Sequence, residues 1–207
     1  MEVVLSMVHP YTYKLQDGNL MLGPVAEFQE RDKVLSNVVN HALDRGVQVV
    51  CHWLQHPESI EGAIEQVTFS VDPLFAWTKD QRMHHVVTSK YGVPIPDNPP
   101  GNISQRSWEN LKKYFTTQSK LREVMGNPDM IIFVGGLLEA CVTSAMGYHH
   151  QYDRRKGQRV AYIPELCVSL DQEQRRMFEG ELEKIAIERV NCAEAQRMFM
   201  NGNTLGM

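Results

Sequence analysis

Apolar and polar positions along the chain fall into blocks that are typical of strands and helices in alternation. Short apolar runs at residues 3–5, 47–51 and 130–134 have the length of strands and show little polar alternation, as in strands buried on both faces. Between the first two runs, apolar residues recur at helical spacing from about residue 29 to 45, and Gly46 ends that helix. A strand–helix–strand order favours a parallel sheet.

The second half of the chain continues the alternation. A helix begins at Thr116 or Thr117 and runs through Met125, where Gly126 and Pro128 end it. We expect the remaining strands near 86–88, 159–163 and 189–190, and the remaining helices over 141–155, 172–187 and 193–200. In the helix 172–187, the side chains expected to face inward are Met177, Leu182, Ile185 and Ala186. The pattern predicts an α/β fold with a doubly wound, mostly parallel sheet flanked by helices on both faces.

The length of 207 residues fits a single domain, 1–207. Residues 52–107 give the weakest pattern, and four prolines between 91 and 102 predict an irregular loop or arm near 91–107. Such a segment suits a lid over a site and a dimer contact equally well.

Composition narrows the class of protein. A hydrophobic content of 43%, a charged content of 22% and a net charge of -4 are typical of a globular protein and argue against nucleic acid as the main partner. Four cysteines without a CxxC pair predict reduced thiols and a cytoplasmic protein. No apolar run approaches the length that spans a bilayer, so we expect no membrane partner.

The candidate chemistry lies just after the apolar run 130–134. Gly135 and Gly136 permit backbone shapes that other residues avoid, and Cys141 follows near the first turn of the next helix. Unpaired amides and the positive end of a helix dipole lower a thiol pKa and can hold an oxyanion, so Cys141 is a candidate nucleophile. The alternative is that Cys141 is a small buried hydrophobic residue.

The segments 135–142 (Gly-Gly-Leu-Leu-Glu-Ala-Cys-Val) and 157–165 (Gly-Gln-Arg-Val-Ala-Tyr-Ile-Pro-Glu) resemble the isochorismatase-like cysteine hydrolase superfamily. The resemblance implies that Gly135 is the family glycine, that Cys141 is the nucleophile and that the fold is of the isochorismatase type. It further implies a hydrolase that acts on C–N bonds other than peptide bonds in a small amide or ureido substrate.

The same resemblance implies a catalytic aspartate and a lysine. Ser6 stands where the family aspartate is expected, and His9 or Asp17 could replace that group. Lys112, shortly before the family-like Phe115, is the first candidate for the lysine. Lys113 and Lys90 are the other candidates for it.

In the resembling family, a cis peptide turns backbone amides toward the substrate oxyanion. The matching bond is Gly136–Leu137, with the amides of Leu137 and Cys141 as donors. The segment 52–56 resembles the metal-binding segment of nicotinamidases, but the aspartate ligand is missing, so we expect no metal and no other cofactor.

Three functions follow from these residues. The first is a Cys141-dependent hydrolase. The second is a catalytically degenerate relative that serves in binding or assembly, and the third is an acyl-transfer enzyme with an altered base. For the enzymes we expect a small-molecule substrate, and we expect the protein to form a homo-oligomer.

Overall fold

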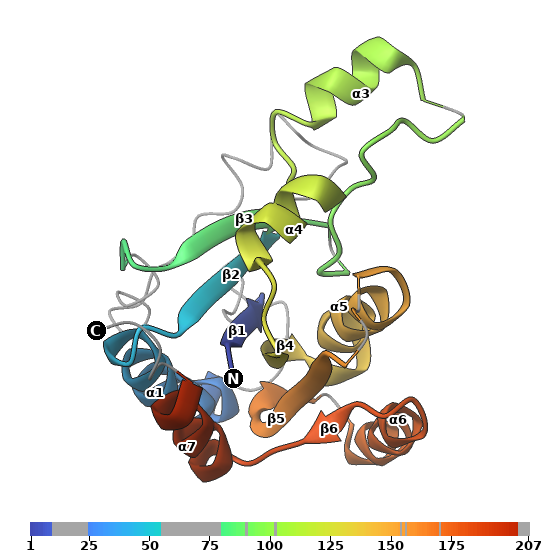
Figure 1. Ribbon diagram of the computed structural model, residues 1–207. Coiled ribbons are helices and arrows are strands. Elements are labelled where there is room, and N and C mark those ends of the chain that lie inside the picture. Colours follow the sequence, from blue (N-terminus) through green and yellow to red (C-terminus); the bar gives the residue numbers. More distant parts are fainter. Residues whose placement is uncertain are drawn as a thin grey trace.

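A parallel sheet forms the centre of the fold in the computed structural model, which describes residues 1–9, 25–54, 80–89, 91–101, 103–153, 155, 157–169 and 171–202. Within these residues the sheet has six strands in the order β3-β2-β1-β4-β5-β6, all parallel (Figure 1). The strands are β1 (Val3–Val8), β2 (Gln48–Leu54), β3 (His84–Thr88), β4 (Met130–Leu137), β5 (Arg159–Val168) and β6 (Glu188–Arg189).

Helices cover both faces of the sheet, which confirms the predicted doubly wound α/β fold. They are α1 (Val25–Asp44), α3 (Gln105–Leu111), α4 (Gln118–Met125), α5 (Thr143–Tyr148), α6 (Gln172–Lys184) and α7 (Cys192–Gly202), with π-helical turns η3 (Leu138–Val142) and η4 (His149–Asp153). Side chains of α1 and α7 pack on one face, and those of α4, α5 and α6 on the other (Figure 1). No described helix combines the length and the apolar character needed to cross a membrane.

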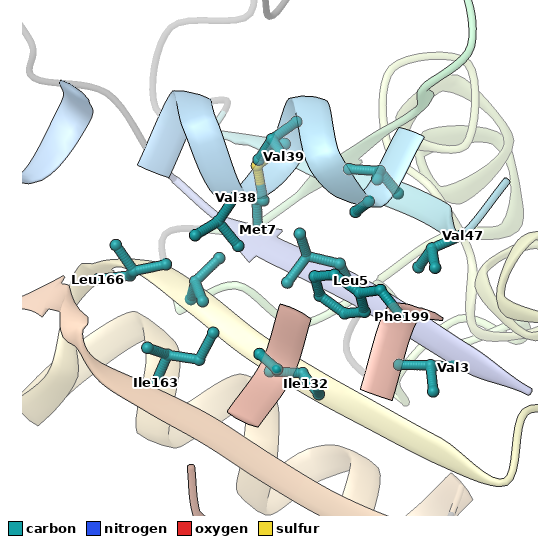
Figure 2. Close-up of a cluster of buried hydrophobic side chains, with 14 of the residues drawn as sticks. Val3, Leu5, Met7, Val38, Val39, Val47, Ile132, Ile163, Leu166 and Phe199 are labelled. Carbon is teal, nitrogen blue, oxygen red and sulfur yellow. The ribbon is translucent and has the colours of Figure 1, made fainter. Parts of the chain in front are cut away.

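The alternation of side chains in β1 joins the two layers of the core. Leu5 and Met7 point toward α1 and α7, where Phe199 and Val39 pack around them (Figure 2). The intervening residues of the strand face the opposite layer, as the two-residue repeat of a strand requires. Burying an aliphatic side chain of this size contributes about 1.5–3 kcal/mol, so this strand stabilises both layers at once.

Two sequence expectations about elements differ from the structure. β1 extends to Val8, so Ser6 lies within the strand rather than after it. In α6, Leu182 is buried as expected, but Met177 and Ile185 are 60% and 41% exposed. The expectation for Met177 is wrong because five residues of helix turn its side chain about 140° away from that of Leu182. Ile185 and Ala186 lie beyond the last residue of the helix.

The proline-rich segment projects from the sheet and carries α3 at its far end (Figure 1). α3 was not predicted, although Ser104 caps it by accepting a hydrogen bond from the Ser107 amide. Trp108 is 2% exposed, and a bridge between Ile95 and Thr117 closes the base of the arm. A local cap and one aromatic anchor therefore order part of a segment that was expected to be irregular.

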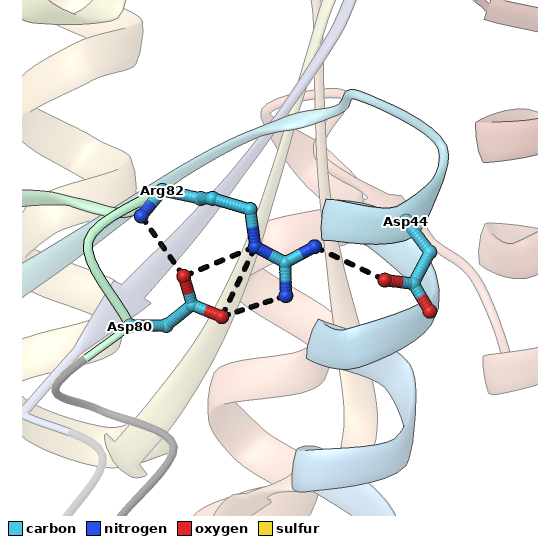
Figure 3. Close-up of polar contacts among 3 residues, drawn as sticks. All are labelled: Asp44, Asp80 and Arg82. Atoms are coloured by element: carbon cyan, nitrogen blue, oxygen red, sulfur yellow. Dashed lines mark hydrogen bonds and ion pairs between the residues drawn. The ribbon is translucent and has the colours of Figure 1, made fainter.

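An exposed ion-pair network joins the end of α1 to the approach to β3. The Arg82 guanidinium donates to Asp80 Oδ2 at 2.6 Å and to Asp44 Oδ1 at 3.0 Å (Figure 3). Exposed pairs of this kind contribute little each, so the network orients the turn before β3 more than it stabilises the fold.

Candidate active site

The carboxyl ends of β1, β2 and β4 lie side by side at one edge of the sheet. Val8 of β1 is paired with His52 of β2 and with Gly135 of β4. Ligands of open α/β sheets bind beyond this edge, so the polar side chains gathered here are the candidates for catalysis.

The two glycines allow β4 to approach the end of β1 closely. A Cβ atom on Gly135, which has a φ of 132°, would lie 2.1 Å from the Val8 carbonyl oxygen. A Cβ atom on Gly136 would lie 2.9 Å from the His9 carbonyl oxygen and 3.1 Å from Cys141 Sγ. The end of β1 and the Cys141 sulfur therefore both lie against Gly136. A side chain at position 135 or 136 would prevent this close approach.

Cys141 lies in η3, directly after β4, and is 7% exposed. Its thiol donates to the Leu137 carbonyl oxygen, with a sulfur–oxygen distance of 3.7 Å. Burial raises the pKa of Cys141 to about 11, while the backbone of Leu137, Val142 and Cys141 itself, and then the Arg31 charge, act to lower it. The sequence predicted a lowered thiol pKa at this position, and burial reverses that expectation.

Ser6 is completely buried on the same face of the sheet as Cys141. Its Oγ lies 3.0 Å from Nε2 of His52, which comes from the neighbouring strand β2. His52 Nδ1 is buried and has no hydrogen-bond partner among the described residues. Burial, aided by the nearby His9 ring, lowers the pKa of His52 to about 3 against an opposing effect of the Gly92 backbone. The serine at the position where the resemblance implied an aspartate is thus paired with a neutral imidazole.

His9 adds a second buried imidazole at the end of β1. Its Nε2 lies 3.3 Å from Thr88 Oγ1 at the end of β3, and burial lowers its pKa to about 4. The loop after β3 packs against this group, because a Cβ atom on Gly92 would lie 2.5 Å from Val8 Cγ1 and 2.9 Å from the Cys141 carbonyl oxygen. These contacts bring the ends of β1, β3 and β4 together around Cys141.

Arg31 and Asp32 of α1 form a buried pair that sequence reasoning missed. Their side chains are 4% and 2% exposed, and Arg31 Nε donates to Asp32 Oδ1 at 2.6 Å. Arg31 Nη1 donates to the Gly135 carbonyl oxygen at 2.6 Å, so α1 holds the glycine that precedes the cysteine loop. A signal existed in the sequence, since Arg31 continues the buried helical stripe of Leu35 and Val38.

Of the lysine candidates, the two that the structure describes, Lys112 and Lys113, are not brought to this group. Lys112 caps the end of α3, the helix of the projecting arm in Figure 1. Its ammonium donates to Glu109 Oε1 at 3.1 Å. Lys113 Nζ donates to Asn110 Oδ1 at 3.2 Å on the same arm. Lys90 and Asp17 lie outside the described residues. A catalytic role for Lys112 stays a prediction that none of its described contacts supports.

The backbone before Cys141 differs from the expectation. The Gly136–Leu137 peptide bond is trans, in contrast to the cis bond that the resemblance implied. Within the described ranges, no three His, Cys, Asp or Glu side chains are grouped so as to hold a metal ion, and His56 lies outside those ranges. The described residues of this edge therefore do not fit a metal centre of the nicotinamidase type.

No model of a known protein family matches the chain, and no curated protein matches it either. Several solved structures are similar over nearly their whole length. An isochorismatase-like hydrolase from Alkaliphilus metalliredigens is 10% identical with a TM-score of 0.58, and the match covers 96% of this chain and 99% of that one. A pyrazinamidase/nicotinamidase from Streptococcus mutans is 16% identical with a TM-score of 0.58, covering 92% and 100%.

A third similar structure is that of a ribonuclease. The MAR1 ribonuclease from Caenorhabditis elegans is 11% identical with a TM-score of 0.55, and the match covers 99% of this chain and 83% of that one. Similarity at such identities establishes a shared fold and leaves the chemistry to be argued from the site.

Proposed function

From the isochorismatase-like hydrolase fold of this chain, we propose that the protein is a cysteine hydrolase. It cleaves the C–N bond of a small amide, ureido or related substrate through a covalent intermediate on Cys141. The observation that carries the proposal is the position of Cys141 Sγ beside Gly136 and the end of β1, at the carboxyl edge of the sheet.

The covalent step uses the sulfur as nucleophile. A bond forms between Cys141 Sγ and the substrate carbonyl carbon, the C–N bond breaks, and the amine leaves with a proton. Water then attacks the thioester, releasing the acid and returning the thiol. The amides of Leu137 and Cys141 form the proposed oxyanion loop, with Gly136 of β4 beside the sulfur. Backbone groups at Leu137 and Cys141 lie near enough to the sulfur to influence the thiol pKa.

The proposed base is a buried neutral imidazole in place of the family aspartate. His9 follows β1, and Ser6 within β1 contacts His52 of the neighbouring β2. The low pKa values of the two histidines keep both rings unprotonated near neutral pH. Because the thiol pKa of about 11 exceeds that of either ring, proton removal accompanies attack on the substrate rather than preceding it. Asp17 is a further candidate for this role.

The test combines turnover with detection of the intermediate. The wild-type protein is incubated with a panel of small primary amides and ureido compounds, and product and intact protein mass are followed together. We expect Cys141→Ala to abolish both turnover and the acyl adduct. Cys192→Ala is the matched control, since Cys192 of α7 packs on the opposite face of the sheet from Cys141 and should change neither. Equal turnover by Cys141→Ala would disprove the proposal.

A second candidate is a degenerate relative that binds a ligand or a partner without turnover. The raised thiol pKa and the serine at position 6 favour it. It predicts no product and no adduct from the whole panel. An acyl-transfer enzyme, the third candidate, would instead accumulate a stable adduct with little hydrolysis.

We further propose that the protein is a cytoplasmic homo-oligomer and that its substrate is a small molecule. All four cysteines are free in the structure, which is compatible with a reducing compartment. The projecting arm is the candidate for contact between copies of the chain. Light scattering of a variant at an exposed arm residue, Tyr114→Ala, tests this, and an unchanged mass would contradict it.

A further inference from the structure

The ion pair between Arg31 and Asp32 in α1 is almost completely buried. Arg31 Nε donates to Asp32 Oδ1 at 2.6 Å, and the two side chains are 4% and 2% exposed. The attraction within a buried pair often does no more than offset the cost of removing both charges from water, so burial of the pair is weak evidence that it stabilises the fold. A further contact of the guanidinium gives a different reason for its position.

This further contact connects α1 to the backbone just before the nucleophile. Arg31 Nη1 donates to the Gly135 carbonyl oxygen at 2.6 Å. Because a peptide unit is planar, a carbonyl that is held in place also fixes the direction of the Gly136 amide. The next residue, Leu137, supplies one of the proposed oxyanion donors, and its carbonyl oxygen accepts from Cys141 Sγ at 3.7 Å. The guanidinium therefore acts on the backbone that precedes both the oxyanion donors and the thiol.

The backbone at this point of β4 is loosely defined by its own sequence and by its pairing with β5. Two consecutive glycines have the greatest conformational freedom of any residue pair, and Gly135 has a φ of 132°. The register between β4 and β5 shifts on both sides of Gly135. Because the ladder to β5 is irregular here, a side-chain hydrogen bond has more influence on the orientation of the peptide than it would have in a regular strand.

We propose that Arg31 is a positioning residue of the hydrolase, which orients the backbone ahead of Cys141 through its hydrogen bond to the Gly135 carbonyl oxygen. Asp32 holds the guanidinium in place, and neither side chain touches the substrate. The inference rests on the proposed function, because a misplaced oxyanion donor has a consequence only where an oxyanion forms. A lysine at position 31 keeps the positive charge but lacks the planar fork that contacts Asp32 and Gly135 together.

Two variants test the proposal in the full chain. Arg31→Lys keeps the charge and loses the fork. The double variant Arg31→Met with Asp32→Leu replaces the pair by apolar side chains, a change that is often neutral for stability, and so removes the contact without leaving a charge buried. Thermal melts verify that each variant is folded at the assay temperature. With an amide that the wild type cleaves, kcat and KM are measured, and hydrogen exchange of the segment 135–142 is followed by mass spectrometry.

Arg175→Lys is the matched control. Arg175 of α6 makes the same two kinds of contact, since it donates to Glu179 Oε1 of its own helix at 3.1 Å and to the Pro164 carbonyl oxygen at 2.8 Å. Pro164 belongs to β5, so this control changes an arginine that holds a different strand.

We expect both variants at position 31 to lower kcat about tenfold, to leave KM within about twofold of the wild type and to speed exchange in 135–142. Arg175→Lys should change none of the three. The positioning role is overturned, and the hydrolase retained, if both variants keep the wild-type kcat, or if KM rises while kcat is unchanged. An equal loss of kcat in Arg175→Lys would also overturn it, because it would indicate a general loosening of the fold. Absence of turnover in the wild type would disprove the hydrolase itself, and this role with it.

Discussion

At the scale of single residues, the environment of Cys141 illustrates two opposing electrostatic effects. Backbone groups around the sulfur and the Arg31 charge favour the thiolate, whereas burial disfavours it and determines the direction of the pKa shift. Burial acts on the neighbouring histidines as well. It lowers the pKa of His9 and that of His52, the partner of Ser6, so both imidazoles are neutral. The site at rest therefore contains a thiol and neutral bases rather than an ion pair.

This protonation state predicts the pH dependence of alkylation. With a pKa raised to about 11, the rate at which iodoacetamide modifies Cys141 should rise about tenfold per pH unit from neutral pH and level off only near pH 11. Mass spectrometry of the peptide that contains Cys141 measures the rate, and the Cys141→Ala variant identifies the signal. A plateau reached below pH 9 would contradict the raised pKa.

The histidines predict a loss of stability in acid. The unfolded chain binds protons to His52 near pH 6.5, but the folded chain does so only near pH 3, so the stabilisation is present above pH 6.5 and is lost as pH falls toward 3. The free energy of unfolding should decline by up to about 1.4 kcal/mol per pH unit in this window.

Urea unfolding between pH 3 and 8 measures this dependence. His52→Gln, which keeps a hydrogen-bonding side chain, should flatten the decline, while His84→Gln at an exposed position should not. A full decline in His52→Gln would assign the effect to other groups.

At the scale of elements, the two threonines before α4 have different roles. Thr117 caps the helix by accepting from the Lys120 amide, whereas Thr116 Oγ1 accepts from the Val87 amide at 2.9 Å and ties the arm to β3. The sequence expected a cap from one of these two residues, and the structure assigns it to Thr117.

Removing the Thr117 cap should therefore destabilise the protein. Thr117→Ala leaves the helix amide without its acceptor and should lower the free energy of unfolding by about 1 kcal/mol. Thr117→Ser retains the hydroxyl and should have a much smaller effect. Chemical denaturation compares the two variants, and equal losses would show that the methyl group, not the cap, is what stabilises.

At the scale of the whole molecule, the sheet is held by two apolar layers that meet at its central strands. Ile132 of β4 is completely buried between β1 and β5. Ile132→Ala should lower the free energy of unfolding by about 2–5 kcal/mol, because it removes buried contacts and leaves a cavity. Val34→Ala, at a residue 39% exposed on α1, should change it by less than about 0.5 kcal/mol. Urea denaturation measures both changes, and similar losses would contradict the layered core.

The sequence by itself determined the architecture of this protein. Strand-length apolar runs, helical spacing and Gly46 predicted the doubly wound sheet, and the segment 135–142 predicted an isochorismatase-like fold, which the solved structures confirm. These features are local, since the period of apolar residues depends only on the repeat of the element they occupy. The two glycines at 135 and 136 were visible in the sequence, but the close approach of Val8 and His9 that requires them is a tertiary contact.

Only the tertiary structure decided which side chains meet. Ser6 and His52 are 46 residues apart, and Arg31 reaches Gly135 from a helix 104 residues away. Such contacts depend on strand register and on how helices cross the sheet, and neither leaves a periodic trace in the sequence. Burial itself, which raises the Cys141 pKa and reverses the expectation from its place at the end of β4, is a property of the assembled fold.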